Sequence, residues 1–213
     1  MSASRTTMGG RMTGAPTRPG GATYAGLFLV TLTTLAYEIL LTRIFSVTMW
    51  YHFAFVAISV AMFGLTAGAL WVYLRPARFP EAATHEDLAR YALLTAGSIV
   101  ASFLTHLCIP FVVDRSAVGL WSLLLTYLVV SVPFVLGGVC VCLALTRFPD
   151  RAGRLYAADL AGAAAGCLLV PPLIRYTDGL AAVLVLAAVG ALGAVAFAAG
   201  AQGRARRRLP WSA

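Results

Sequence analysis

Six long apolar runs, separated by short polar connections, constrain this chain more than any other feature of its sequence. An α-helix rises about 1.5 Å per residue, so roughly 20 apolar residues cross a hydrocarbon core about 30 Å thick. Runs of this length cover residues 24–45, 51–74, 91–113, 117–146, 155–174 and 179–200. We therefore predict an all-α integral membrane protein, a bundle of about six transmembrane helices.

The composition argues against an ordinary soluble domain. Of the 213 residues, 60% are hydrophobic and 11% are charged, whereas soluble domains carry about 25% charged residues. Membrane lipids are therefore the expected partner of most of the surface. Every basic residue is Arg, which suggests a GC-rich bacterial genome. We expect a multi-pass protein of the bacterial inner (cytoplasmic) membrane.

The two ends of the chain differ in composition from the apolar runs between them. Residues 1–22 are rich in Gly, Ser, Thr, Pro and Arg, which predicts a disordered cytoplasmic tail. Residues 23–200 form the predicted transmembrane domain, and residues 201–213 form a basic cytoplasmic C-terminus. A cleaved signal peptide is the competing interpretation. However, the first run is full length and has no small-residue cleavage site, so we expect it to be retained.

The arginines alternate from side to side of the predicted bundle. Thirteen of the 16 lie in the N-terminal tail, in the connections after the second and fourth spans, and at the C-terminus; the others are Arg43, Arg115 and Arg175. Short cytoplasmic loops carry most of the Arg and Lys in membrane proteins. The asymmetry predicts that both termini are cytoplasmic (N-in/C-in). Since the arginines form no patch with interleaved aromatic residues, we expect no nucleic-acid partner.

Three prolines predict irregular helix geometry. The fourth span, of about 30 residues, is too long to cross a membrane upright, and Pro133 is expected to kink it. Pro171 and Pro172 are expected to end helical hydrogen bonding in the fifth span, because proline has no backbone N–H.

Four ionisable residues fall in the outer half of the predicted bundle: Glu38, Arg43, His52 and His106. An acid inside a spanning helix is costly and usually faces a partner or a cavity. Glu38 also shares a helix face with Thr31, Thr34 and Thr42, which predicts an inward-facing polar stripe. Two interpretations stay open: a pocket for a cationic ligand or for protons, and a buried ion-pair network that fixes helix packing.

Small residues at helical spacing predict close helix contacts. Gly64 and Gly68 form a GxxxG pair in the second span, and Asp159 shares a face with Gly162 and Gly166 in the fifth. The sequence contains no nucleophile paired with a base, no phosphate-binding glycine loop and no metal-ligand spacing. We expect no catalytic residue, no metal and no cofactor.

Two groups of residues resemble a known family when they are taken together. The first is Glu38, Leu41, Arg43, Phe45, Ser46, Tyr51, His52, Phe55, Ile58, Ser59, Ala61, Met62, Gly64 and Gly68. The second is Val132, Pro133, Phe134, Gly137, Gly153, Arg154, Leu155, Tyr156, Asp159, Leu160, Gly162, Ala163 and Gly166. Both resemble helices of bacterial membrane-bound spermidine-synthase-like (polyamine aminopropyltransferase-like) proteins.

In that family a membrane domain precedes a cytoplasmic Rossmann-like aminopropyltransferase domain, and the resemblance covers the membrane half alone. It implies a non-catalytic membrane module: an anchor, a regulatory module, or an accessory subunit of a larger assembly with other membrane subunits or a separate catalytic partner. The alternative is a small transporter or binding protein for a cationic ligand such as a polyamine, or for protons, that uses Glu38 and nearby histidines. Enzymatic activity by this chain alone is the less expected outcome.

Overall fold

The computed structural model describes residues 19–48, 52–109 and 117–208, and over these ranges it contains helices and no strand. The long helices are α1 (Gly21–Thr48), α2 (Phe53–Leu74), α3 (Thr84–Cys108), α4 (Ala117–Thr146), α5 (Ala152–Tyr176) and α6 (Gly179–Arg208). All six are long and apolar enough to cross a membrane. The predicted all-α fold, with six helices long and apolar enough to span a membrane, is confirmed. Most of the predicted tail, the end of the third predicted span and Arg115 lie outside the described residues.

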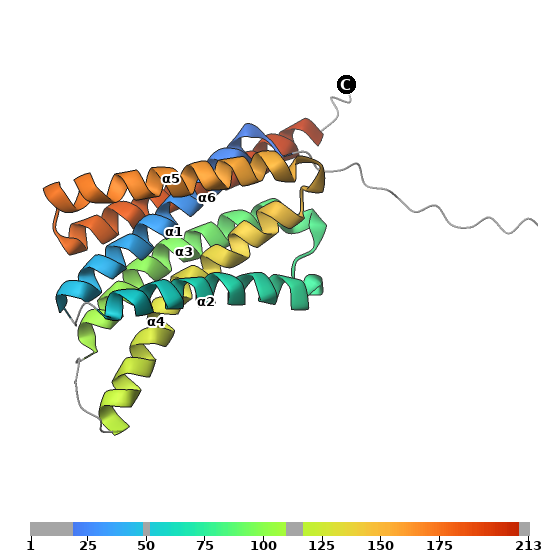
Figure 1. The fold of residues 1–213 in the computed structure, drawn as a ribbon. Helices are drawn as coiled ribbons and strands as arrows, with labels where there is room; N and C mark the ends of the chain where they lie inside the picture. The colour runs from blue at the N-terminus through green and yellow to red at the C-terminus, as the bar shows by residue number, and fades with distance from the viewer. Residues whose placement is uncertain (1–18, 49–51, 110–116, 209–213) are drawn as a thin grey trace, which may run out of the picture.

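Helix α1 lies at the centre of the bundle, in contact with α2, α4, α5 and α6 (Figure 1). Its side chains are buried on several sides, as expected for a helix that is apolar all round; among them Leu27, Tyr37 and Leu41 are fully enclosed. The start of α1 lies beside the last turns of α6, where Gly200 approaches Ala22. We call this the terminal end of the bundle. The distal end carries the turn at Thr177 and Asp178, between α5 and α6.

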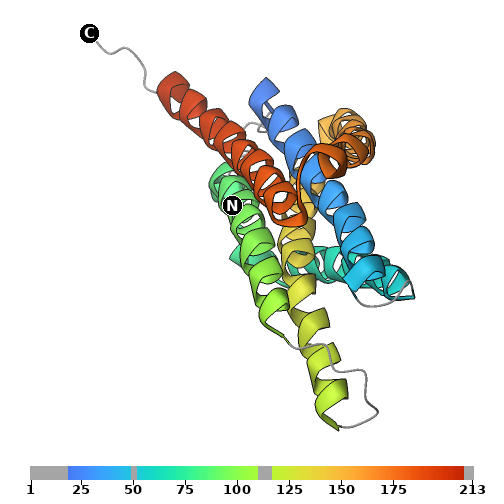
Figure 2. The ribbon, with the colours of Figure 1, turned by 90° about the vertical axis from the view of Figure 1, so that its left-hand side faces the viewer.

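The amino-terminal part of α4 extends beyond the neighbouring helices (Figures 1 and 2). This α4 arm, residues 117–128, exposes large apolar side chains around much of its circumference: Val118, Leu120, Trp121, Leu124, Leu125 and Leu128. Pro133 follows the arm and lies inside the continuous 30-residue helix. The arm therefore has few neighbours among the residues that the structure describes.

The predicted end of the fifth span at Pro171 and Pro172 is wrong. Helix α5 continues through both prolines to Tyr176, and the Thr177 N–H still donates to the Leu173 carbonyl. Each proline removes one N–H donor, and its ring crowds the carbonyl four residues earlier, which bends a helix without having to end it. Both rings lie on exposed positions of α5, where a bend meets no neighbouring helix.

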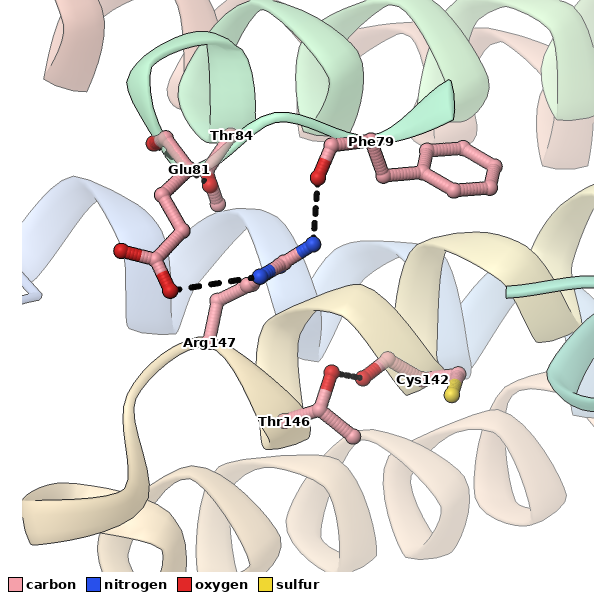
Figure 3. A network of polar contacts seen from close by, with 6 residues as sticks. All are labelled: Phe79, Glu81, Thr84, Cys142, Thr146 and Arg147. Carbon is pink, nitrogen blue, oxygen red and sulfur yellow. Dashed lines mark hydrogen bonds and ion pairs between the residues drawn. The ribbon is translucent and has the colours of Figure 1, made fainter. Parts of the chain in front are cut away.

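A polar network joins two connections at the terminal end (Figure 3). The Arg147 guanidinium, just after α4, donates to the Phe79 carbonyl and forms an ion pair with Glu81 at 3.5 Å. Thr84 then donates to the Glu81 carbonyl at 2.9 Å. The network therefore holds the α2–α3 connection against the end of α4.

Candidate functional site

Glu38 lies on α1 and is 9% exposed, so its side chain faces other helices. Among the described residues, no hydrogen bond or ion pair to its carboxyl group is found. Two threonines of the same predicted stripe bond within their own helix: Thr34 donates to the Val30 carbonyl at 2.8 Å and Thr42 to the Ile39 carbonyl at 2.7 Å. Such back-bonding satisfies a hydroxyl without a neighbouring helix. Glu38 is therefore the ionisable member of the stripe, and it has no partner in the part of the chain described.

His106 is 7% exposed near the distal end of α3. Its ring lies against Phe45 of α1, with ring centroids 5.0 Å apart. The buried Nδ1 atom has no hydrogen-bond partner among the described residues. A buried polar atom in this state normally bonds to water or to a ligand.

Two further buried hydroxyls, those of Ser102 and Tyr37, lie close to each other on neighbouring helices. Ser102 precedes His106 by one helical turn on the same face of α3, and its hydroxyl lies near that of Tyr37 on α1. Neither hydroxyl has a hydrogen bond of normal geometry within the described residues. The Tyr37 ring is held by stacking on Phe134 of α4, with centroids 5.7 Å apart. We call Tyr37, Ser102 and His106 the polar interior cluster.

The polar interior cluster offers both donors and acceptors inside an apolar bundle. Tyr37 is 0% exposed and Ser102 is 4% exposed, so bulk water does not satisfy them. Buried waters typically make about three hydrogen bonds to groups of this kind. An ordered water that reached these atoms would therefore find hydrogen-bond partners.

The other two predicted members lie elsewhere. Arg43 is exposed on α1, and His52 is exposed just before α2 begins. Glu38, Arg43 and His106 form no hydrogen bond or ion pair with one another in the described part of the chain. Tyr37 and Ser102 were not among the site residues predicted from the sequence. The four-residue spacing of Ser102 and His106, both polar in an apolar span, was the signal available.

The predicted packing glycines lie at close helix contacts. A methyl group added at Gly64 or Gly68 would overlap α4, at the Phe134 side chain and the Val135 carbonyl oxygen respectively. Close backbone approach of this kind is the usual role of small residues in membrane helices.

The fifth helix packs on α1 in a similar way. A methyl group at Gly162 would overlap the Phe28 backbone, and one at Gly166 would meet the Leu32 carbonyl oxygen. Beside them the Thr31 hydroxyl donates to Asp159 Oδ1 at 2.5 Å. Asp159 thus pairs with a hydroxyl of α1 at the glycine-lined contact.

Within the described residues, no group of three or more His, Cys, Asp or Glu side chains is arranged to hold a metal ion. The cysteines Cys108, Cys140, Cys142 and Cys167 are free thiols. None of the known protein families, curated proteins and solved structures compared with this chain matches it.

Proposed function

We propose that this chain is a non-catalytic polytopic membrane module that acts as an anchor, regulatory or accessory subunit of a larger assembly. The observation that carries the proposal is the α4 arm, which leaves the bundle and exposes apolar side chains such as Trp121 (70% exposed) and Leu124. Lipid alone can cover the outer face of a peripheral helix. A projecting arm also offers a surface against which a neighbouring membrane subunit can pack. Packing between membrane helices depends on such shape fit.

Site-specific photocrosslinking in intact membranes tests this proposal. A photoreactive amino acid replaces Leu124 on the arm, and a matched variant carries it at Leu192, which is 59% exposed on α6. The proposal predicts a discrete protein adduct from position 124, with mainly lipid adducts from position 192. Lipid adducts alone from both positions would contradict it.

The proposed assembly includes a separate catalytic partner of the aminopropyltransferase kind, an extension that rests on the resemblance of spans one, two, four and five. On this proposal the purified chain alone transfers no aminopropyl group from decarboxylated S-adenosylmethionine to putrescine. Turnover that follows the chain through purification, with host synthases deleted, would count against a non-catalytic role.

We further propose that the terminal end faces the cytoplasm of a bacterium, with the protein in the inner membrane. The support is the positive charge of the connections at this end: Arg75, Arg78 and Arg90 lie near one of them, and Arg147 and Arg151 near the other. A reporter that is active only in the periplasm, fused after Ala213, is expected to stay inactive. Activity of that fusion would reverse the orientation.

A second candidate function is transport or binding of a cationic ligand such as a polyamine, or of protons. The specific observation is that Glu38 is buried without a partner in the described residues, while Tyr37, Ser102 and His106 carry unpartnered polar atoms. An intramembrane ionisable group of this kind usually marks a ligand or ion path.

Proteoliposomes that contain the purified chain separate the two candidates. Spermidine uptake or proton flux that is lost in Glu38→Gln and kept in Glu81→Gln would favour the second candidate, because Glu81 is an exposed acid at the terminal end. Flux equal to that of empty liposomes would eliminate it.

A further inference from the structure

A groove of about 350 Å³ opens at the distal end of the bundle, between α1, α3 and the α5–α6 turn. Its volume is within the range of about 300–1,000 Å³ that small-molecule sites occupy. The lining residues include Leu40, Arg43, Phe103, Ile174, Asp178 and Gly179. Most of this wall is aliphatic or aromatic, and its two charged residues are of opposite sign.

The side chains of both charged residues, Arg43 and Asp178, are exposed. The Arg43 guanidinium makes no hydrogen bond or ion pair with any described residue. The Asp178 carboxylate accepts a hydrogen bond from the Ala181 N–H at 2.7 Å, which fixes it at the start of α6. Although both line the same groove, they form no ion pair with each other. One oxygen of Asp178 stays open to a second partner.

We propose that this groove binds a zwitterionic phospholipid that carries a primary ammonium, with one acyl chain against the apolar wall. The phosphate would lie next to Arg43 and the ammonium next to Asp178, so that each exposed charge meets its opposite. Arginine is well suited to phosphate because its guanidinium presents several donors in one plane.

The arrangement favours this lipid over two other occupants. An anionic phospholipid satisfies Arg43 but places a second negative charge near the Asp178 carboxylate. A free polyamine satisfies Asp178 but leaves the apolar wall uncovered and faces repulsion from Arg43. The presence of two opposite, unpaired charges in one apolar groove is therefore the feature that selects the ligand.

Native mass spectrometry of the full chain, purified in detergent, measures the preference. Phosphatidylethanolamine, phosphatidylglycerol and diacylglycerol are titrated separately, and the expected order of affinity is the order in which they are named. Arg43→Gln is expected to weaken phosphatidylethanolamine binding about fivefold, as one arginine near a lipid surface contributes roughly that factor. Arg175→Gln is the matched control, since this exposed arginine of α5 lies over the Tyr176 ring and does not line the groove.

Asp178→Asn tests the headgroup part of the proposal most directly. Asparagine caps a helix about as well as aspartate, so the start of α6 is preserved. This variant is expected to lose the preference for phosphatidylethanolamine over phosphatidylglycerol. An unchanged preference in Asp178→Asn, or unchanged phosphatidylethanolamine binding in Arg43→Gln, would overturn the proposal.

Gly179→Leu tests the apolar part, because a side chain there would enter the groove, with the nearest atom 3.9 Å from the added Cβ. Gly97→Leu is the control for added bulk, since nothing lies within 4 Å of a Cβ at that position of α3. Lipid retention is expected to fall in Gly179→Leu alone, with thermal unfolding confirming that both variants fold. Equal retention by Gly179→Leu and the wild type would place the lipid elsewhere.

Discussion

Two helix pairs in this bundle, α1–α5 and α2–α4, both approach closely at glycines. Their polar contacts lie in different places. In α1–α5, Gly162 and Gly166 lie against α1, and the Thr31–Asp159 hydrogen bond runs between the helices themselves. In α2–α4 the closest approach is made by Gly68 and by Gly138. The charged contact nearest that pair is the Arg147 network, which joins the residue after α4 to the α2–α3 connection, beyond the end of α2.

The difference separates two ways of holding membrane helices together. The Thr31–Asp159 bond is partly buried between two helices, which limits competition from water. At the terminal end, water competes with every charged contact. The α2–α4 pair has one long thiol contact between its spans, from Cys142 to the Ala69 carbonyl at 3.8 Å. It must therefore rely on shape at its glycines, while α1–α5 combines shape with a specific hydrogen bond.

Gly68→Ala is expected to have the largest effect, a loss of about 2–3 kcal/mol of unfolding free energy, because overpacked side chains cost roughly that much. The added methyl group would meet backbone atoms of Val135, Gly138 and Val139, which cannot rotate away. Unfolding by denaturant in mixed micelles measures the loss. Gly97→Ala is the control and is expected to be neutral or slightly stabilising.

Gly162→Ala is expected to cost less, about 1–2 kcal/mol. Its methyl group meets the backbone of one α1 residue, Phe28, and the neighbouring Thr31–Asp159 bond still holds the helices in register. The same micelle unfolding assay gives the value. A loss larger than that of Gly68→Ala would contradict the idea that α2–α4 depends more heavily on shape.

The Thr31–Asp159 bond should show a measurable coupling energy of its own. A double-mutant cycle with Thr31→Val and Asp159→Ala is expected to give about 0.6 kcal/mol and at most about 1.7 kcal/mol, the average and the maximum measured for hydrogen bonds between membrane helices. Asp159→Asn keeps an acceptor oxygen and should retain most of the coupling. Additive effects of the two substitutions would mean that the bond contributes nothing to α1–α5.

The sequence predicted the spans and several of the close contacts, because apolar length and small-residue spacing are local properties. Six runs of apolar residues became six helices, and Gly64, Gly68, Gly162 and Gly166 each lie against a neighbouring backbone or side chain. The partner of each helix is a non-local property, and nothing in the spacing of Asp159 indicated Thr31. The continuation of α5 through Pro171 and Pro172 was missed, since it depends on the exposure of both rings.

The polar interior was less accessible to sequence reasoning. Glu38 stood out because a carboxyl group in an apolar run is rare and costly. Tyr37 and Ser102 did not, because tyrosine and serine are ordinary in membrane helices, and only the packing of α1 against its neighbours reveals that their hydroxyls lack partners.

The smallest effect is expected for Glu81→Gln, at the polar end of α2–α4. The Glu81 side chain is 88% exposed and its ion pair with Arg147 measures 3.5 Å, a geometry in which water and salt screen most of the attraction. Exposed pairs of this kind contribute about 0–0.5 kcal/mol. Arg147→Met should cost more, about 1 kcal/mol, because the guanidinium is also the hydrogen-bond donor to the Phe79 carbonyl. If Glu81→Gln instead matched Gly68→Ala in micelle unfolding, and 0.5 M salt reproduced its effect in the wild type, the end contact rather than the glycines would hold α2 against α4.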